Sequence, residues 1–151
     1  EQAAASQRFI AEMIRPAVHD AARALLHRHV QAGARVAIVT ATNEFITRPI
    51  ATLFGVDQLI ATELQRDAQG RVTGAIHGVP AYREGKVTRV QQWLAQQGLA
   101  CADFERITFY SDSTNDLPLL ERVSHPVATN PAPALERIAL ERGWPILRLF
   151  A

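Results

Sequence analysis

The 151-residue sequence has few cysteines, few aromatic residues and almost no net charge. It contains one cysteine and 7% aromatic residues, and its formal charge is +1. The single cysteine, Cys101, excludes an internal disulfide and a thiolate metal cluster, so we expect a reduced, cytoplasmic setting. The small net charge argues against a nucleic-acid binder that depends on a strong basic field. No apolar run approaches the ~20 residues of a membrane span. Residues 1–4 also lack the basic segment that begins a secretory signal. We therefore expect neither a nucleic acid nor a membrane as partner.

The composition and the pattern of apolar residues predict a soluble α/β domain. Apolar residues make up 48% and charged residues 21%, the balance of a globular protein. Strands and helices alternate, and crossovers of a dozen or more residues require a parallel sheet. The fold class predicted is a doubly wound parallel (Rossmann-like) α/β sheet with a β-hairpin insertion. Strands are expected at 35–39, 107–110, 125–128 and 145–149, helices at 16–31, 44–54, 86–97, 131–142 and from 116, and the hairpin at 58–77.

Two acidic residues follow the predicted strand at 107–110. Asp112 and Asp116 lie on the loop between this strand and a helix, and ligands bind at the carboxyl ends of strands in open α/β sheets. Two carboxylates 4 Å apart repel each other by about 4 kcal/mol at an effective dielectric near 20. A divalent cation with oxygen ligands, such as Mg²⁺, reverses that sign. The alternative is that the two residues only stabilise a turn and cap the helix that follows.

Two further polar residues occupy corresponding places along the chain. Thr40 follows the strand at 35–39, where a hydroxyl and free loop amides can bind an anion, although Thr40 could merely cap the next helix. For Asn43 we favour the capping role. Lys86 begins a helix, where a positive charge interacts unfavourably with the helix macrodipole. The same charge could bind a phosphate at that place, and the alternative is a solvated surface lysine. Together these residues and the acids supply the groups needed to bind a phosphoryl group. Transfer of that group would also need a nucleophile, which is not among them.

Three segments resemble the haloacid-dehalogenase-like phosphatases. VAIVTAT at 36–42, GK at 85–86 and SDSTND at 111–116 are similar to the second, third and fourth motifs of that superfamily, in the same order. The pattern NDLPLL…PVATNP…GWPIL and the hairpin are similar to its phosphoserine-phosphatase-like branch, subfamily IB. The resemblance covers roughly residues 16–150.

The resemblance implies a role for each matched residue. Asp112 would contact Mg²⁺ directly and Asp116 would support the metal site, while Thr40, Lys86 and Asp116 would take part in catalysis. The phosphate would be bound by four residues: Thr40, Ala41, Lys86 and Asn115. The substrate would be a small phosphorylated metabolite, selected largely by the cap. The resemblance also implies that residues 1–14 end a helical cap and that residues 15–151 form a core without its first strand.

The sequence departs from the family at the first motif. These enzymes attack with an aspartate in D-x-D-x-T, and no such motif occurs among the 151 residues. Asp20 is expected in the middle of a helix, where it cannot serve as this nucleophile. We therefore expect the nucleophile to lie upstream of Glu1 and residues 1–151 alone to show little turnover.

Two other classes of protein stay open on the sequence alone. One is a non-catalytic α/β module that binds a metal or an effector. The other is a receiver-like domain in which Asp112 itself accepts a phosphoryl group, although a receiver places its acid pair after an early strand and this chain has none there. The upstream sequence would separate the enzyme from the binding module.

Overall fold

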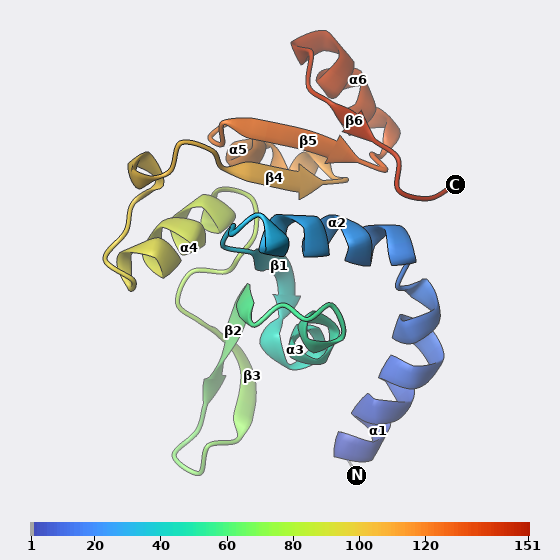
Figure 1. Cartoon of the computed structure of the whole chain (residues 1–151). Coiled ribbons are helices and arrows are strands. Elements are labelled where there is room, and N and C mark those ends of the chain that lie inside the picture. Colours follow the sequence, from blue (N-terminus) through green and yellow to red (C-terminus); the bar gives the residue numbers. More distant parts are fainter. Residues whose placement is uncertain (1) are drawn as a thin grey trace. The chain divides into compact units, whose positions relative to one another are not determined.

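The computed structural model describes residues 2–151, with the side chains of all of these except residues 2, 3 and 6. The chain forms two compact units (Figure 1), the first ending at Gly78 and the second comprising Val79–Ala151. Each unit contains a three-stranded sheet. Because both sheets contain parallel strands flanked by helices, the predicted α/β class with parallel strands is confirmed, and the hairpin insertion with it.

The first unit begins with helices and ends in a mixed sheet. Its sheet has the order β1-β2-β3, in which β1 and β2 are parallel and β2 and β3 form the antiparallel hairpin. Its elements in chain order are α1 (Gln2–Phe9), a π-helical turn η1 (Ile10–Ile14), a 3₁₀ turn η2 (Arg15–Ala17), α2 (Asp20–Gln31), β1 (Ala37–Asn43), α3 (Glu44–Leu53), β2 (Gln58–Arg66) and β3 (Val72–His77).

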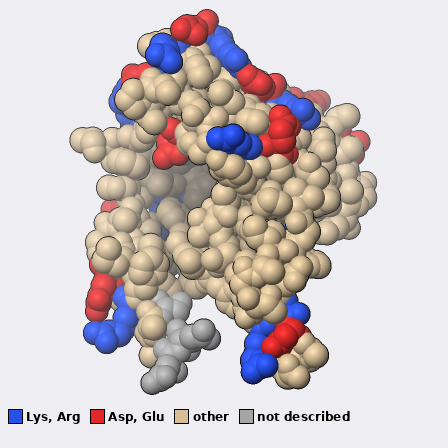
Figure 2. All heavy atoms as spheres, turned by 180° about the vertical axis from the view of Figure 1, so that it is seen from behind, with Lys and Arg blue, Asp and Glu red and all other residues tan. Residues whose placement is uncertain are grey.

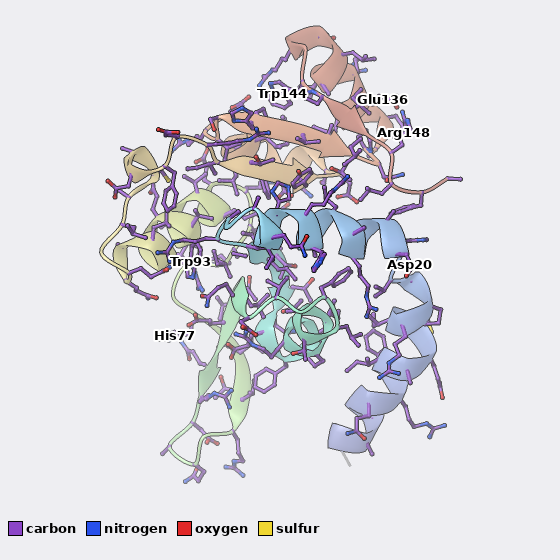
Figure 3. All side chains as sticks on the ribbon, in the orientation of Figure 1. Asp20, His77, Trp93, Glu136, Trp144 and Arg148 are labelled. Atoms are coloured by element: carbon purple, nitrogen blue, oxygen red, sulfur yellow. The ribbon has the colours of Figure 1, made fainter. Side chains whose placement is uncertain are left out.

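The helix predicted over residues 16–31 is shorter than expected. Pro16 lies in η2, and Val18 then adopts an extended conformation (φ −81°, ψ 107°), which ends that turn. The helix α2 therefore begins at Asp20 (Figure 3), so the prediction that Asp20 lies in the middle of a helix was wrong.

The strand predicted over residues 35–39 instead continues to Asn43, so residues 40–43 are the end of β1 and not a loop. Thr40 pairs with Ala61 of β2 and Asn43 pairs with Thr62, so the register shifts between them. Ala41 and Thr42 form a bulge in the strand. Asn43 then caps α3, as predicted, because its side-chain oxygen accepts hydrogen bonds from Phe45 N at 3.1 Å and Ile46 N at 3.2 Å.

The second unit is a parallel sheet covered by helices. Its sheet has the order β4-β5-β6, and its core consists of Leu120, Ala128, Leu135 and Ala139. Partly buried Phe109 is among the residues that pack against this core. Trp144 (Figure 3) is another. The elements are α4 (Glu84–Ala95), η3 (Cys101–Asp103), β4 (Thr108–Ser111), η4 (Thr114–Asp116), α5 (Leu117–Leu120), β5 (His125–Thr129), α6 (Pro133–Arg142) and β6 (Ile146–Leu147).

The surface carries charges of both signs (Figure 2), and the helices of the described residues are short or polar. On the face shown in Figure 2, basic and acidic side chains are interspersed, and the basic ones form no single large patch. None of the helices that the structure describes is both long and apolar enough to cross a bilayer.

Candidate active site

Asp112 and Asp116 are positioned by the end of β4. Ser111, the last residue of that strand, is buried and donates a 2.6 Å hydrogen bond from Oγ to Oδ2 of Asp116. The same Oγ accepts a hydrogen bond from Ser113 N at 3.2 Å. One hydroxyl therefore fixes both the turn after the strand and the orientation of the Asp116 carboxylate.

Lys86 and Asp116 form a buried ion pair. Nζ of Lys86 lies 2.6 Å from Oδ1 of Asp116, and the two side chains are only 9% and 12% exposed. Lys86 is therefore not a solvated surface lysine. Asp116 does not serve only in a turn, because it also pairs with Lys86. Removing two charges from water is costly unless their geometry and hydrogen bonds compensate, and Ser111 supplies the second partner of Asp116. Asp116 is the one described residue that pairs with Lys86, so further ammonium protons are available to an anion.

A tight loop sets the start of α4 and thereby the position of Lys86. A Cβ atom at Gly85 would lie 2.0 Å from the carbonyl oxygen of Pro80, so only glycine fits there. Arg83, just before the helix, has φ +50°, an unusual backbone conformation for a residue with a side chain. Lys86 N in turn donates to Arg83 O at 3.0 Å. The loop thus holds the first turn of α4 against the segment that precedes it.

Asp112 has an exposed side chain on a fixed backbone. Its carbonyl oxygen accepts a hydrogen bond from Ala132 N at 2.9 Å. No residue that the structure describes donates a hydrogen bond to its carboxylate, which is the kind of hard oxygen donor that Mg²⁺ prefers. Within the described side chains, no three His, Cys, Asp or Glu residues are grouped as a ready metal site. Among these groups, Asp112 therefore supplies one hard oxygen donor that such an ion could use.

Thr40 and Ala41 lie at the carboxyl end of β1, in the first unit. The Thr40 hydroxyl oxygen accepts a hydrogen bond from Thr42 N at 3.2 Å, which leaves its proton to donate to another group. Ala41 is exposed in the bulge. The chemistry expected of this segment is present, and its meeting with Asp112 in one site stays a prediction.

Among the predicted site residues, the structure joins Lys86 directly to Asp116, with Asp112 and exposed Asn115 on the same loop. Sequence reasoning missed Ser111, which binds Asp116. The available signal was a small hydroxyl residue between the apolar strand and the first acid. It also missed why Gly85 must precede Lys86, because the approach of Pro80 is visible only in three dimensions.

The chain matches the haloacid dehalogenase-like hydrolase family over residues 1–121. It is 46% identical to a histidinol-phosphatase of Neisseria meningitidis serogroup C over 139 residues, which cover 92% of this chain and 63% of that protein. It is 34% identical to a phosphoserine phosphatase of Mycobacterium tuberculosis, covering 97% of this chain and 46% of that protein. The chain thus spans less than two thirds of the length of these relatives.

Two solved structures show the same fold. A protein of unknown function from Bordetella pertussis Tohama I is 51% identical, with a TM-score of 0.96 over 99% of this chain and 66% of that one. A substrate-bound phosphoserine phosphatase has the same fold, with a TM-score of 0.61 and 19% identity over 83% of this chain and 56% of that one. The chain belongs to the haloacid dehalogenase-like hydrolases, as the three sequence motifs predict.

Proposed function

We propose that this chain belongs to a Mg²⁺-dependent phosphomonoester hydrolase that acts on a small phosphorylated metabolite. The observation that best supports the proposal is the buried pair of Lys86 and Asp116, since a lysine that a carboxylate holds in place at a helix start suits phosphate binding. The relatives named histidinol-phosphatase and phosphoserine phosphatase support the same reaction class.

In this proposal each residue takes the role that its resemblance to the family motifs implies. Lys86 neutralises charge on the phosphoryl group, and Asp116 with Ser111 prevents its ammonium group from rotating away. The Thr40 hydroxyl donates to a phosphate oxygen, and the exposed backbone at Ala41 and the Asn115 side chain approach other oxygens. Phosphoryl transfer depends mainly on positioning and charge stabilisation, which these groups supply.

Asp112, with support from Asp116, would hold the metal. Mg²⁺, when bound, supplies a positive charge that offsets the phosphate oxygens. The exposed Asp112 carboxylate, on a backbone fixed by Ala132 N, is suited to direct contact with the ion. Because Lys86 and Ser111 already occupy both Asp116 oxygens, we assign Asp116 an indirect part in the metal site.

The nucleophile in this proposal is an aspartate outside the 151 residues. Its carboxylate would attack phosphorus, and the ester oxygen would leave as the alcohol with a proton from the second aspartate of the family's D-x-D-x-T motif. Water would then hydrolyse the aspartyl-phosphate to free aspartate and inorganic phosphate. The D-x-D-x-T motif of the family is the segment expected to supply the nucleophile, since the printed sequence contains no such motif.

The first experiment assays the full-length natural protein with an aryl phosphate and Mg²⁺. We expect turnover that is lost on chelation with EDTA. Asp112→Asn should lower kcat/KM by at least about 100-fold, because losing a group that only orients a metal ligand already costs about 10–100-fold. Asp57→Asn, an exposed aspartate before β2, is the matched control and should retain activity. Metal and phosphate binding without turnover would instead support a non-catalytic binding module.

A further inference from the structure

Asn130 links the C-terminal segment of the second unit to the sheet. Its backbone N donates to Leu147 O at 2.8 Å, which continues the pairing of β5 with β6. Its side-chain oxygen accepts a hydrogen bond from Leu149 N at 2.9 Å, and its side-chain nitrogen donates to Phe150 O at 2.8 Å. The amide thus takes the place of a peptide group in binding the segment after β6.

The backbone of Asn130 adopts an uncommon conformation to make these contacts. Its φ is +40°, a left-handed value shared by only one other non-glycine residue in the described part of the chain, Arg83. Asparagine tolerates this region better than most residues, at some cost in backbone energy. Such a conformation persists where surrounding contacts determine it, and here three hydrogen bonds to one segment do so.

The loop that Asn130 begins continues directly to Asp112. Two residues later, Ala132 N donates a 2.9 Å hydrogen bond to the backbone oxygen of Asp112. Ala132 is also the N-cap of α6, and its position depends on the turn at Asn130 and Pro131. On its other side, Asp112 follows Ser111, which is fixed by Ser113 and Asp116. Hydrogen bonds and short stretches of backbone therefore connect the C-terminal segment to the Asp112 backbone without a break.

We propose that Asn130 is a positioning residue that holds the Asp112 backbone in place for metal binding by anchoring residues 149 and 150. The inference rests on the proposed function, in which Asp112 contacts the metal. Without the side-chain amide of Asn130, the turn at 130–132 loses its attachment to the C-terminal segment. The Asp112 carboxylate then samples more positions, and the metal binds more weakly.

The test measures Mn²⁺ affinity by electron paramagnetic resonance in the full-length natural protein. Asn130→Gly keeps the positive φ but removes both side-chain bonds, and we expect a loss of affinity of about 10-fold, the lower end for groups that orient metal ligands. Asn130→Asp keeps an acceptor for Leu149 N but has no N–H for Phe150 O, so an intermediate loss is expected. It also serves as the test if the glycine variant does not fold.

The matched control is Arg148→Gln. Arg148 pairs with Glu136 of α6 (Figure 3), so this variant removes a contact of the same C-terminal segment while leaving both Asn130 bonds intact. We expect its Mn²⁺ affinity to be unchanged. Equal losses in Asn130→Gly and Arg148→Gln would overturn the inference, because they would indicate general loosening of the segment.

A further variant separates this inference from the proposed function. If Asp112→Asn weakens Mn²⁺ binding and Asn130→Gly and Asn130→Asp do not, the positioning role is wrong and the metal site stands. If Asp112→Asn leaves Mn²⁺ affinity unchanged, the assignment of Asp112 as metal ligand fails, and the inference fails with it.

Discussion

The buried pair of Lys86 and Asp116 contributes both to the stability of the fold and to the proposed phosphate site. Each side chain is about nine-tenths buried, and each loses its main charged partner if the other is removed. Loss of one partner leaves an uncompensated buried charge, whereas loss of both removes that penalty. The pair is thus at once a stability feature and the centre of the proposed phosphate site.

This pair gives the first prediction at the residue scale. Asp116→Ala should lower the free energy of unfolding by about 3 kcal/mol, and Lys86→Met combined with it should cost less than the sum of the single changes. Urea denaturation of the full-length protein measures both. Glu84→Ala, which breaks the exposed pair of Glu84 with Arg122 at 3.5 Å, is the control and should cost less than about 1 kcal/mol. Additive losses from Lys86 and Asp116 would argue against their coupling.

At the scale of the element, α4 depends on its first turn. Gly85→Ala places a methyl group against the Pro80 carbonyl, so the loop must shift and Lys86 must move with it. We expect a stability loss of about 1–3 kcal/mol and a fall in kcat/KM. Gly98→Ala, just past the other end of α4, has open space around its Cβ and only backbone strain at φ +71°. It should cost about 1 kcal/mol and leave kcat/KM unchanged; a similar activity loss in both variants would count against the steric argument.

The hairpin between β2 and β3 gives a prediction about pH. The carboxylate of Asp67 accepts hydrogen bonds from Arg71 N and Gln69 N, both at 2.9 Å, and pairs with the Arg71 side chain. The backbone hydrogen bond from Arg71 is the largest cause that lowers the pKa of Asp67. Desolvation opposes it by a smaller amount, and the Arg71 side chain and Gln69 N lower the pKa further. The charged turn therefore stabilises the folded state above the ordinary aspartate pKa of about 4, and this contribution is lost as the pH falls through the lowered value.

The measurement compares wild type with Asp67→Asn by urea denaturation between pH 7 and pH 2. The difference in unfolding free energy should be constant above about pH 5 and should shrink as the pH falls below about 4. Asp57→Asn serves as the control, since no described residue donates to the Asp57 carboxylate. A difference between wild type and Asp67→Asn that does not change with pH would refute the role of the charge.

At the scale of the whole molecule, the proposed function makes a prediction about Thr40 and Asp112. We expect inorganic phosphate with Mg²⁺ to slow amide hydrogen exchange in both residues 40–43 and residues 111–116 of the full-length protein, because one bound anion would contact both segments. Residues 67–71 at the hairpin tip are the internal control and should exchange at the same rate. Protection confined to residues 111–116 would place the phosphate site in the second unit alone.

The sequence by itself predicts the α/β class, the hairpin, the cap at Asn43 and the motif residues around Asp112. These follow from local signals: apolar periodicity, turn residues and the order of polar residues after strands. Its errors lie at element ends, where Val18 ends a turn and where β1 continues through a bulge to Asn43. Those ends depend on pairing with β2 and on backbone geometry, and a local pattern contains neither.

Only the tertiary structure decided that Lys86 is buried against Asp116, that Ser111 orients that carboxylate, and that Asn130 connects the C-terminal segment to the Asp112 loop. Ser111 and Asp116 are 5 positions apart in the sequence, and Asn130 and Leu149 are 19 apart. Lys86 and Asp116 are 30 positions apart. The sequence supplies the chemical groups, but the distances between them are set by the packing of β4, β5, α4 and α6, which brings remote parts of the chain within hydrogen-bond range.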